Sequence, residues 1–184
     1  MEVEIPTLET ARLVLRPFRE EDHVPLHAMM QDPDVVRFIG DRKTPTRQEA
    51  WRAIAGWIGH WALRGYGAWA VEERASGALI GRIGFINPVD WPALELGYML
   101  GKAYWGRGFA TEGCRAALDW GFGSAGFERV ISLIDPANTA STAVAGRIGE
   151  TLAGEAELFG HRLGVYAVDR ATWEARRDAG HSPR

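Results

Sequence analysis

The chain is poor in cysteine and lysine, and it has no long apolar run. Its single cysteine, Cys114, excludes an intramolecular disulfide and indicates a reducing, cytoplasmic compartment. Lysine occurs only at Lys43 and Lys102, and the formal net charge of −3 lacks the basic excess that nucleic-acid binding requires. No apolar stretch has the length of a membrane span. We therefore expect neither nucleic acid nor a membrane among its partners.

The length and composition are typical of one globular domain. The 184 residues include 46% hydrophobic and 24% charged side chains, and no linker, repeat or low-complexity segment divides them. We therefore predict a single domain over residues 1–184. His23 and His27 have metal-compatible spacing on a predicted helix, but no third ligand accompanies them, so no metal is expected.

The pattern of apolar residues predicts an α/β fold, because alternation indicates strands and a spacing of three and four indicates helices. Thr46 and Glu49 form a predicted capping box for a helix that ends before Gly65. The predicted strands cover 12–18, 68–73, 79–86, 94–100 and 129–134, with two more near the end of the chain, and the predicted helices cover 20–31, 46–63, 110–124 and a short segment from Ser141.

Tryptophan is concentrated on one predicted helix. Trp51, Trp57 and Trp61 fall on one face of the helix over 46–63. A core face is the ordinary explanation and contact with a substrate is the alternative, and the sequence leaves both open. Trp91 lies in a proline-flanked loop and is a predicted substrate contact, because loops commonly determine specificity.

The most informative segment is the glycine loop, residues 105–111. It follows the predicted strand over 94–100 and precedes an amphipathic helix. We expect Gly106 and Gly108 to allow close approach of a ligand. The first turn of the helix presents unpaired N–H groups and the positive end of the helix dipole. The arrangement predicts an anion site with a phosphorylated cofactor as its ligand, and an ordinary tight turn is the alternative.

Two well-known phosphate motifs do not account for this loop. No Gly-Lys-Ser/Thr follows the glycines, so the loop is not a P-loop. The dinucleotide fingerprint is half present, with Asp135 at the end of the next strand, but Thr111 occupies the position of the third glycine. Fewer than fifty residues follow Asp135, too few to complete the usual doubly wound half.

Five segments, in order, resemble the GNAT acetyltransferases. The loop resembles motif A of that family, Gln/Arg-x-x-Gly-x-Gly/Ala, and Trp105 at its first position resembles the branch of ribosomal-protein N-terminal (alanine/serine) acetyltransferases. The other segments are TARLVLRP at 10–17, ED at 21–22 with DPDV at 32–35, PANTAS at 136–141, and VYAV at 165–168 ahead of Trp173. The resemblance covers about residues 7–175. Glu150 departs from it, because the family usually has an aromatic residue there.

This resemblance implies a fold, a reaction and a cofactor. The fold is a mixed, largely antiparallel sheet flanked by helices, in which a splayed strand pair forms the cofactor cleft. The reaction is direct transfer of an acetyl group from acetyl-CoA to a primary amine, on a protein N-terminus or a small molecule, in a ternary complex. The predicted cofactor-binding residues are Met99, Leu100, Gly101, Trp105, Gly106, Arg107, Gly108, Phe109, Ala110, Thr111, Asn138 and Ser141.

Acetyl transfer to an amine needs a base, a donor for the carbonyl oxygen and an acid for the leaving thiolate. Glu95 on the motif strand is the predicted base and a contact for the amine, and a solvent-facing carboxylate is the alternative. Ser141 and Tyr166 are the rival acids that the resemblance implies. A backbone N–H near Leu100 is expected to polarise the acetyl carbonyl. Arg107 is either a phosphate contact or a solvated loop side chain.

A second class of function stays open, namely a non-catalytic module that binds acyl-CoA or a dinucleotide. Such a module would bind the cofactor without turnover. The sequence does not identify the acceptor amine, although the acidic segments expected around the cleft suit a cationic acceptor. It also leaves open whether the chain forms a homodimer.

Overall fold

The structure is a computed structural model that describes residues 4–180, so the predicted domain limits at 1 and 184 lie outside it. One eight-stranded sheet organises the chain, in the order β1-β2-β3-β4-β5-β6-β8-β7. The strands are β1 (Leu8–Glu9), β2 (Leu13–Arg16), β3 (Ala68–Glu73), β4 (Ala78–Ile86), β5 (Glu95–Leu100), β6 (Arg129–Ile134), β7 (Thr151–Leu158) and β8 (His161–Asp169). Only β5 and β6 run parallel, which confirms the expected mixed, largely antiparallel sheet.

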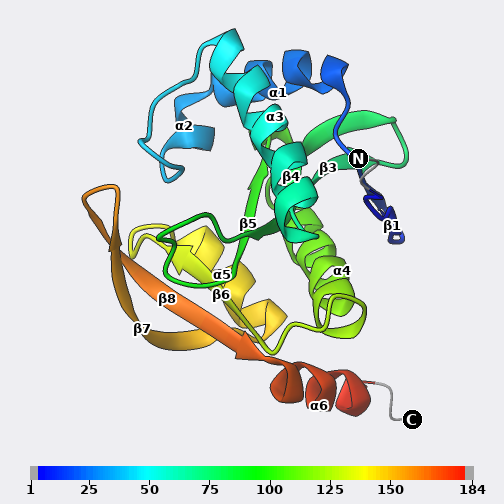
Figure 1. Ribbon diagram of the computed structural model, residues 1–184, viewed down its shortest axis with the longest axis vertical. Coiled ribbons are helices and arrows are strands. Elements are labelled where there is room, and N and C mark those ends of the chain that lie inside the picture. Colours follow the sequence, from blue (N-terminus) through cyan, green and yellow to red (C-terminus); the bar gives the residue numbers. More distant parts are fainter. Residues whose placement is uncertain (1–3, 181–184) are drawn as a thin grey trace.

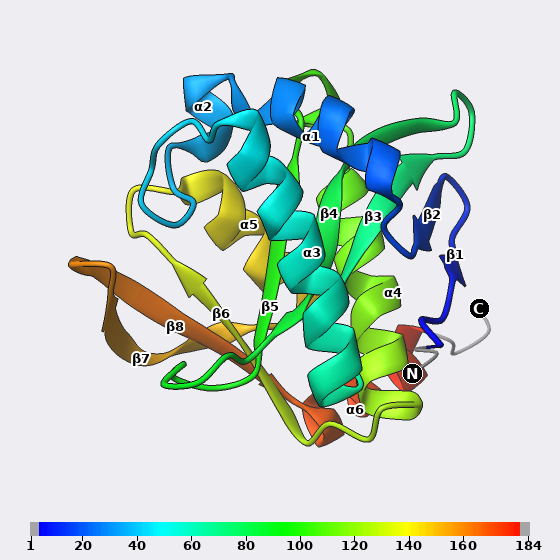
Figure 2. The same ribbon diagram turned by 45° about the horizontal axis from the view of Figure 1, so that its top comes forward.

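Helices cover both faces of the sheet (Figures 1 and 2). α1 and α3 lie on one face, and α4 and α5 lie on the other, with α6 following β8. The helices are η1 (Glu20–Asp22), α1 (His23–Met30), α2 (Pro33–Val36), α3 (Arg47–Arg64), η2 (Lys102–Tyr104), α4 (Phe109–Gly123), α5 (Thr139–Ile148) and α6 (Arg170–Gly180).

Local sequence explains the limits of α3. The Thr46 hydroxyl accepts a hydrogen bond from the Glu49 N–H, and the Glu49 carboxylate accepts one from the Thr46 N–H at 2.7 Å, which is the predicted capping box. The helix ends at Gly65, whose φ of +74° is the left-handed conformation that glycine adopts at little cost. The turn that follows aligns β3 for pairing with β4.

Alternation along β5 divides the core between the two faces of the sheet. Leu96 and Leu100 belong to the cluster that includes α4, whereas Met99 belongs to the cluster that includes α1 and α3. Period-two alternation predicts that successive side chains of β5 point to opposite faces of the sheet in this way. Glu95 and Gly97 share the Met99 face, so a change at either position acts on the side covered by α1 and α3.

Several elements differ from the pattern-based expectation. The helix predicted over 20–31 is a 3-10 turn followed by α1, and α5 begins at Thr139 rather than Ser141, with Asn138 as its N-cap. β1, α2 and α6 were not predicted, because two or four residues give no periodicity and α6 is mostly polar. Trp173 anchors α6 by donating to Asp119 of α4 at 3.0 Å. Within residues 4–180, no helix is both long and apolar enough to cross a membrane.

Candidate active site

The glycine loop places the start of α4 at the end of β5. Gly106 and Gly108 have φ values of +72° and +80°, and Gly108 is the N-cap of α4. No side chain caps this helix, so the protein leaves the first-turn N–H groups, including those of Phe109, Ala110 and Thr111, free for solvent or a ligand. These donors and the helix dipole suit an anion such as a pyrophosphate.

The two glycines of the loop are required mainly by backbone conformation. A Cβ at Gly106 would meet no atom within 4 Å, and a Cβ at Gly108 would meet only Arg12 Nη2, at 3.4 Å. Space inside the protein is therefore not what selects glycine. Positive φ is unfavourable for residues with a Cβ, and it is this conformation that turns the loop into the helix.

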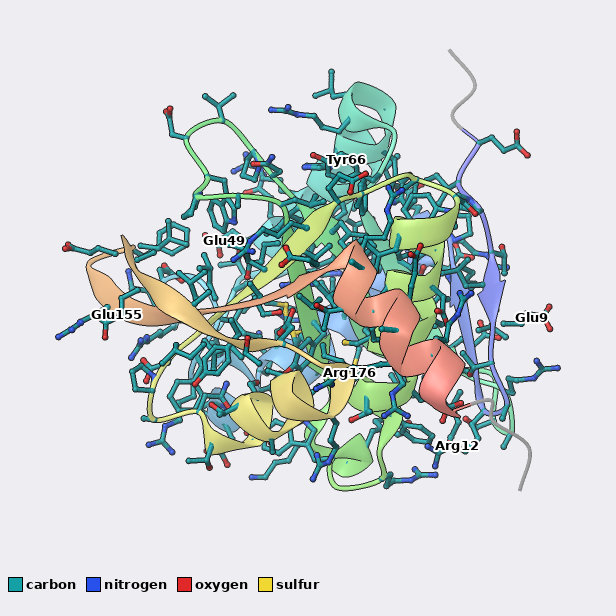
Figure 3. All side chains as sticks on the ribbon, turned by 90° about the horizontal axis from the view of Figure 1, so that it is seen from below. Glu9, Arg12, Glu49, Tyr66, Glu155 and Arg176 are labelled. Carbon is teal, nitrogen blue, oxygen red and sulfur yellow. The ribbon has the colours of Figure 1, made fainter. Side chains whose placement is uncertain are left out.

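Two side chains hold the loop in place, namely Arg12 from outside it, which Figure 3 labels, and Trp105 from within it. The Arg12 guanidinium donates to the Arg107 carbonyl at 2.9 Å and pairs with Glu112 of α4 at 2.6 Å. The Trp105 indole donates to the Leu100 carbonyl at 2.8 Å, which ties the loop to the end of β5. Trp105 is thus a structural clamp on the loop, whatever else it contacts.

The side chain of Arg107 is already engaged. Its guanidinium pairs with Glu73 of β3 at 2.7 Å and lies over the Phe109 ring at 4.5 Å. Its contacts are with Glu73 and with the ring of the first residue of α4, and its role toward a phosphate stays a prediction.

β5 and β6 pair at only one position and then part. Glu95 is in register with Ile131, and the Ile131 N–H donates to the Leu94 carbonyl at 2.9 Å. We call this junction the vertex and define it by Glu95, Leu96, Ile131, Ser132 and Leu133. The Ser132 hydroxyl lies 3.0 Å from the Leu96 carbonyl, so a side chain bridges the gap where the backbone ladder stops, and the backbone of Leu133 lies near the Glu95 carboxylate.

The ladder with β4 decides which backbone groups of β5 face the gap. The Gly101 N–H donates to Ile80, and in an antiparallel pair every second residue bonds the same neighbour, so the backbone of Met99 and Gly101 faces β4. The N–H groups of Tyr98 and Leu100 face the other way, into the gap. Within the predicted contact run from Met99 to Gly101, only the Leu100 N–H therefore faces the gap, and the Tyr98 N–H just before the run faces it as well.

Glu95 is held as a hydrogen-bond acceptor at the vertex. The Trp91 indole donates to its carboxylate at 2.6 Å, and the nearby Leu133 backbone and the charge of Arg82 also favour its ionised form. Burial outweighs these contacts and raises the pKa of Glu95, which is the direction expected for a carboxyl in a partly dry cleft. A raised pKa brings a carboxyl closer to the range that is useful for a base at neutral pH.

Glu150 is a buried carboxylic acid next to the vertex. It is 3% exposed, its Oε1 lies 2.9 Å from the Ser132 hydroxyl, and its Oε2 is buried without a partner. Burial raises the pKa of Glu150 to about 8, with a further contribution from the negative charge of Glu95. Glu150 therefore does not fill the packing role of the aromatic residue that the resembled family has there.

The hydrogen bonds of Ser132 agree with a protonated Glu150. One hydroxyl has one proton, and the Leu96 carbonyl can only accept. Ser132 makes both of its short contacts as true hydrogen bonds only when it donates to Leu96 and accepts from Glu150. Two carboxyl groups of different character thus lie at this place in the fold, Glu95 at the vertex, which accepts from Trp91, and Glu150 beside it, which keeps its proton near neutral pH.

The residues predicted to act on the leaving group lie around α5 and β8. Asn138 caps α5, because its side-chain oxygen accepts from the Ser141 N–H at 3.2 Å. The Tyr98 hydroxyl lies 3.4 Å from the Ser141 carbonyl, which brings the start of α5 close to β5. Tyr166 is in register with Ser132 and therefore projects from the face of the sheet opposite to Glu95.

The tryptophan stripe of α3 has a mixed role. Trp61 is 2% exposed and donates to the Ala68 carbonyl at 3.1 Å, so it belongs to the core. Trp51 is 45% exposed, and Trp57 is partly buried with its ring 5.1 Å from the Arg82 guanidinium. Only Trp57 of the three therefore borders the Glu95 side of the vertex.

Sequence reasoning missed Arg82, Tyr98 and Ser132 as residues of this site. Arg82 is the single charged residue in the otherwise apolar strand ALIGRIGFI, and Ser132 is the single polar residue that follows Arg129 in RVISLI. A lone charged or hydroxyl residue in a buried strand needs a partner, and this signal could have drawn attention to both.

Comparisons with known proteins agree on a family. Residues 12–151 match the family model described as an acetyltransferase (GNAT) domain. The uncharacterized N-acetyltransferase p20 of Bacillus licheniformis is 32% identical over 138 residues, which cover 73% of this chain and 76% of that protein.

Solved structures are similar over nearly the whole chain. An acetyltransferase from Agrobacterium tumefaciens str. C58 is 32% identical and has a TM-score of 0.79, covering 91% of this chain and 96% of that one. RimL, a ribosomal L7/L12 alpha-N-protein acetyltransferase in complex with coenzyme A, is 22% identical with a TM-score of 0.75, covering 89% of this chain and 98% of that one. At that identity the similarity to RimL is one of fold.

Proposed function

The chain belongs to the GNAT family of acetyl-CoA-dependent N-acetyltransferases, and on that premise we propose that it moves the acetyl group directly to a primary amine within a ternary complex. The single observation that carries this proposal is the gap between β5 and β6, which opens at the vertex and leads to the glycine loop. A gap of this kind accepts an extended cofactor arm, and the loop accepts its phosphates.

In the proposed complex, the pyrophosphate of acetyl-CoA lies on the backbone N–H groups of residues 107–111. The pantetheine arm lies along the gap-facing backbone of Tyr98 and Leu100, opposite Asn138 and Ser141 at the start of α5. The Leu100 N–H, together with that of Tyr98, is placed to stabilise the oxyanion that forms on the acetyl carbonyl.

The proposed reaction begins with the amine. Glu95 accepts a proton from the acceptor amine as the nitrogen attacks the thioester carbon, and negative charge develops on the carbonyl oxygen. The carbon–sulfur bond then breaks, and the coenzyme A thiolate takes a proton from Ser141, with Tyr166 as the rival donor. Glu95 then releases its proton to solvent, and Ser141, or Tyr166 in its place, takes a proton back from solvent, which completes the cycle.

Direct transfer is supported by the state of the single cysteine. Cys114 is fully buried in α4, and burial raises the pKa of its thiol well above the usual value. No other cysteine exists in the chain. A covalent acetyl-cysteine intermediate would need an accessible thiolate, which this residue does not provide.

An acetyl-CoA consumption assay tests the proposed function. The panel should contain peptides with free N-termini, free amino acids and simple amines, with mass spectrometry of the acetylated product. We expect release of coenzyme A and a matching gain of one acetyl group on at least one amine. Tight coenzyme A binding without transfer to any member of the panel would contradict the proposal and favour the non-catalytic module.

A further inference from the structure

Arg82 of β4 holds a buried nitrogen that has no hydrogen-bond partner. Among the side chains of residues 4–177, Arg82 Nη1 and Glu150 Oε2 are the two atoms in this condition. A buried carboxyl can keep its proton and become neutral, but a guanidinium stays charged. The unpaired Nη1 is thus the less easily explained of the two, because burying a charged donor without a partner costs free energy.

The guanidinium lies on the face of β5 that holds Glu95. Arg82 Nη1 is 3.2 Å from the position that a Cβ on Gly97 would occupy, and Glu95 Oε1 is 4.0 Å from the same point. Opposite charges therefore flank one glycine in the middle of β5. Gly97 has no side chain to separate them, and a larger residue there would press on the guanidinium.

Arg82 and Glu95 do not satisfy one another. No salt bridge joins them in the described part of the chain, although their charges attract. Glu95 instead accepts a hydrogen bond from the Trp91 indole at 2.6 Å. The Trp57 ring, 5.1 Å from the guanidinium, supports it by a cation–π contact that uses no N–H group. Arg82 consequently has donors to spare beside the proposed base.

We propose that the acceptor is a free α-amino acid, with its carboxylate on Arg82 and its amine beside Glu95. This inference rests on the proposed function. A guanidinium binds a carboxylate through charge-assisted and often paired hydrogen bonds. The two opposite charges around Gly97 match a molecule whose amine and carboxylate are separated by one carbon. A peptide N-terminus has an uncharged amide in place of that carboxylate and leaves Arg82 unpaired.

The test compares each free L-amino acid with its carboxamide, which keeps the amine and side chain but lacks the carboxylate. For the wild-type protein we expect kcat/KM for the best free acid to exceed that for its carboxamide by about 10- to 10²-fold, the range of a hydrogen bond to a charged group. Arg82→Met should remove most of this preference by lowering kcat/KM for the acid only. Arg64→Met removes the same positive charge from an exposed position and should leave the preference for the free acid unchanged.

Several outcomes would overturn the proposal. Carboxamides or peptides acetylated as fast as free acids by the wild-type protein would do so without any variant. Equal losses for acid and carboxamide in Arg82→Met would show that Arg82 only shapes the site. Arg82→Lys keeps the positive charge but loses the paired N–H groups of the guanidinium. It controls for misfolding in Arg82→Met, and it should retain part of the preference for the free acid. Failure of the proposed function looks different, because no amine of any kind would then be acetylated.

Discussion

The glycine loop and the vertex hold their charged groups in opposite ways. Around the loop, Arg12 pairs with Glu112 and Arg107 pairs with Glu73, all at or near the surface. Around the vertex, Arg82 and Glu150 each bury an atom without a partner. Surface pairs of this kind contribute little to stability but fix a geometry, whereas buried unpaired groups cost stability and are kept where they serve another purpose.

This difference assigns separate tasks to the two regions. The loop offers backbone N–H groups whose positions depend on local conformation, and such groups bind an anion without taking part in proton transfer. At the vertex and beside it, burial has raised the pKa values of Glu95 and Glu150, which brings these carboxyl groups closer to the range that is useful for proton transfer. Changes in the loop should therefore act on cofactor affinity, and changes at the vertex should act on turnover.

The largest effect is expected from Gly108→Val in the loop. A β-branched residue is poorly tolerated at a φ of +80°, so the first turn of α4 would reorient and lose its charge-assisted bonds to the pyrophosphate. We expect coenzyme A affinity to fall roughly 10²-fold or more, since each such bond contributes about 1.5–3 kcal/mol. Calorimetric titration with coenzyme A measures this directly.

Gly160→Val is the matched control for that change. Gly160, in the turn between β7 and β8, has a φ of +73° and open space around it. A valine there meets the same backbone strain as at Gly108 but lies outside the glycine loop. Coenzyme A affinity should stay within about twofold of wild type. An equal loss in both variants would mean that the loop result reports general destabilisation.

The next effect in size is expected from Glu95→Gln at the vertex. The amide keeps the shape and cannot accept the proton of the amine, so kcat should fall roughly 10²-fold or more. Activity should partly recover as pH rises, because free amine then accumulates in solution. Glu157→Gln, an exposed change on β7, serves as the control. Turnover by Glu95→Gln within about twofold of wild type across the pH range would assign the proton transfer elsewhere.

A smaller effect is expected from Ser141→Ala at the start of α5. If Ser141 protonates the thiolate, kcat should fall roughly tenfold or more with little change in KM for acetyl-CoA, because the contact matters mainly in the transition state. Tyr166→Phe should then be close to wild type. The reverse pattern would move the role to Tyr166, and equal small losses would leave the thiolate to be protonated by solvent.

The smallest effect on turnover, but a distinct effect on stability, is expected from Glu150→Gln. The folded-state pKa of Glu150, about 8, lies above the unfolded value of about 4.3. The contribution of Glu150 to the unfolding free energy of the wild-type protein is therefore fully present below the unfolded-state pKa. It is lost as pH rises through the folded-state pKa of about 8. A glutamine does not titrate, so its stability relative to wild type should rise over that window.

Urea unfolding of wild type and Glu150→Gln at a series of pH values from 4 to 9 checks this. The difference in unfolding free energy should grow by at most about 1.4 kcal/mol for each pH unit within the window. A difference that does not change with pH would show that Glu150 is not protonated in the folded state. Activity at pH 7 should change by less than about threefold, because glutamine also donates to Ser132.

The sequence predicted the loop well because all of its determinants are local. Gly106 and Gly108, the strand before them and the amphipathic helix after them lie within one short segment. The capping box of α3 is local in the same way. Patterns of this kind report backbone conformation directly, which is why the fold and the family could be read before any contact was known.

The vertex could not be predicted in the same way because it is assembled from distant segments. Arg82, Glu95, Ser132 and Glu150 come from three strands and the residue before a fourth. Their pKa shifts arise from burial and from one another, and neither is visible in sequence spacing. Whether the backbone N–H of Tyr98 faces the gap depends on the register between β4 and β5. The sequence of a single strand does not reveal that register.

The division between binding and chemistry is tested most directly by titrating coenzyme A into the Glu95→Gln protein by calorimetry, on the same preparation that is used for turnover. We expect a dissociation constant within about twofold of wild type alongside the roughly 10²-fold loss of kcat. A loss of coenzyme A affinity that matches the loss of turnover would contradict it, because Glu95 would then belong to the cofactor site rather than to the proton transfer.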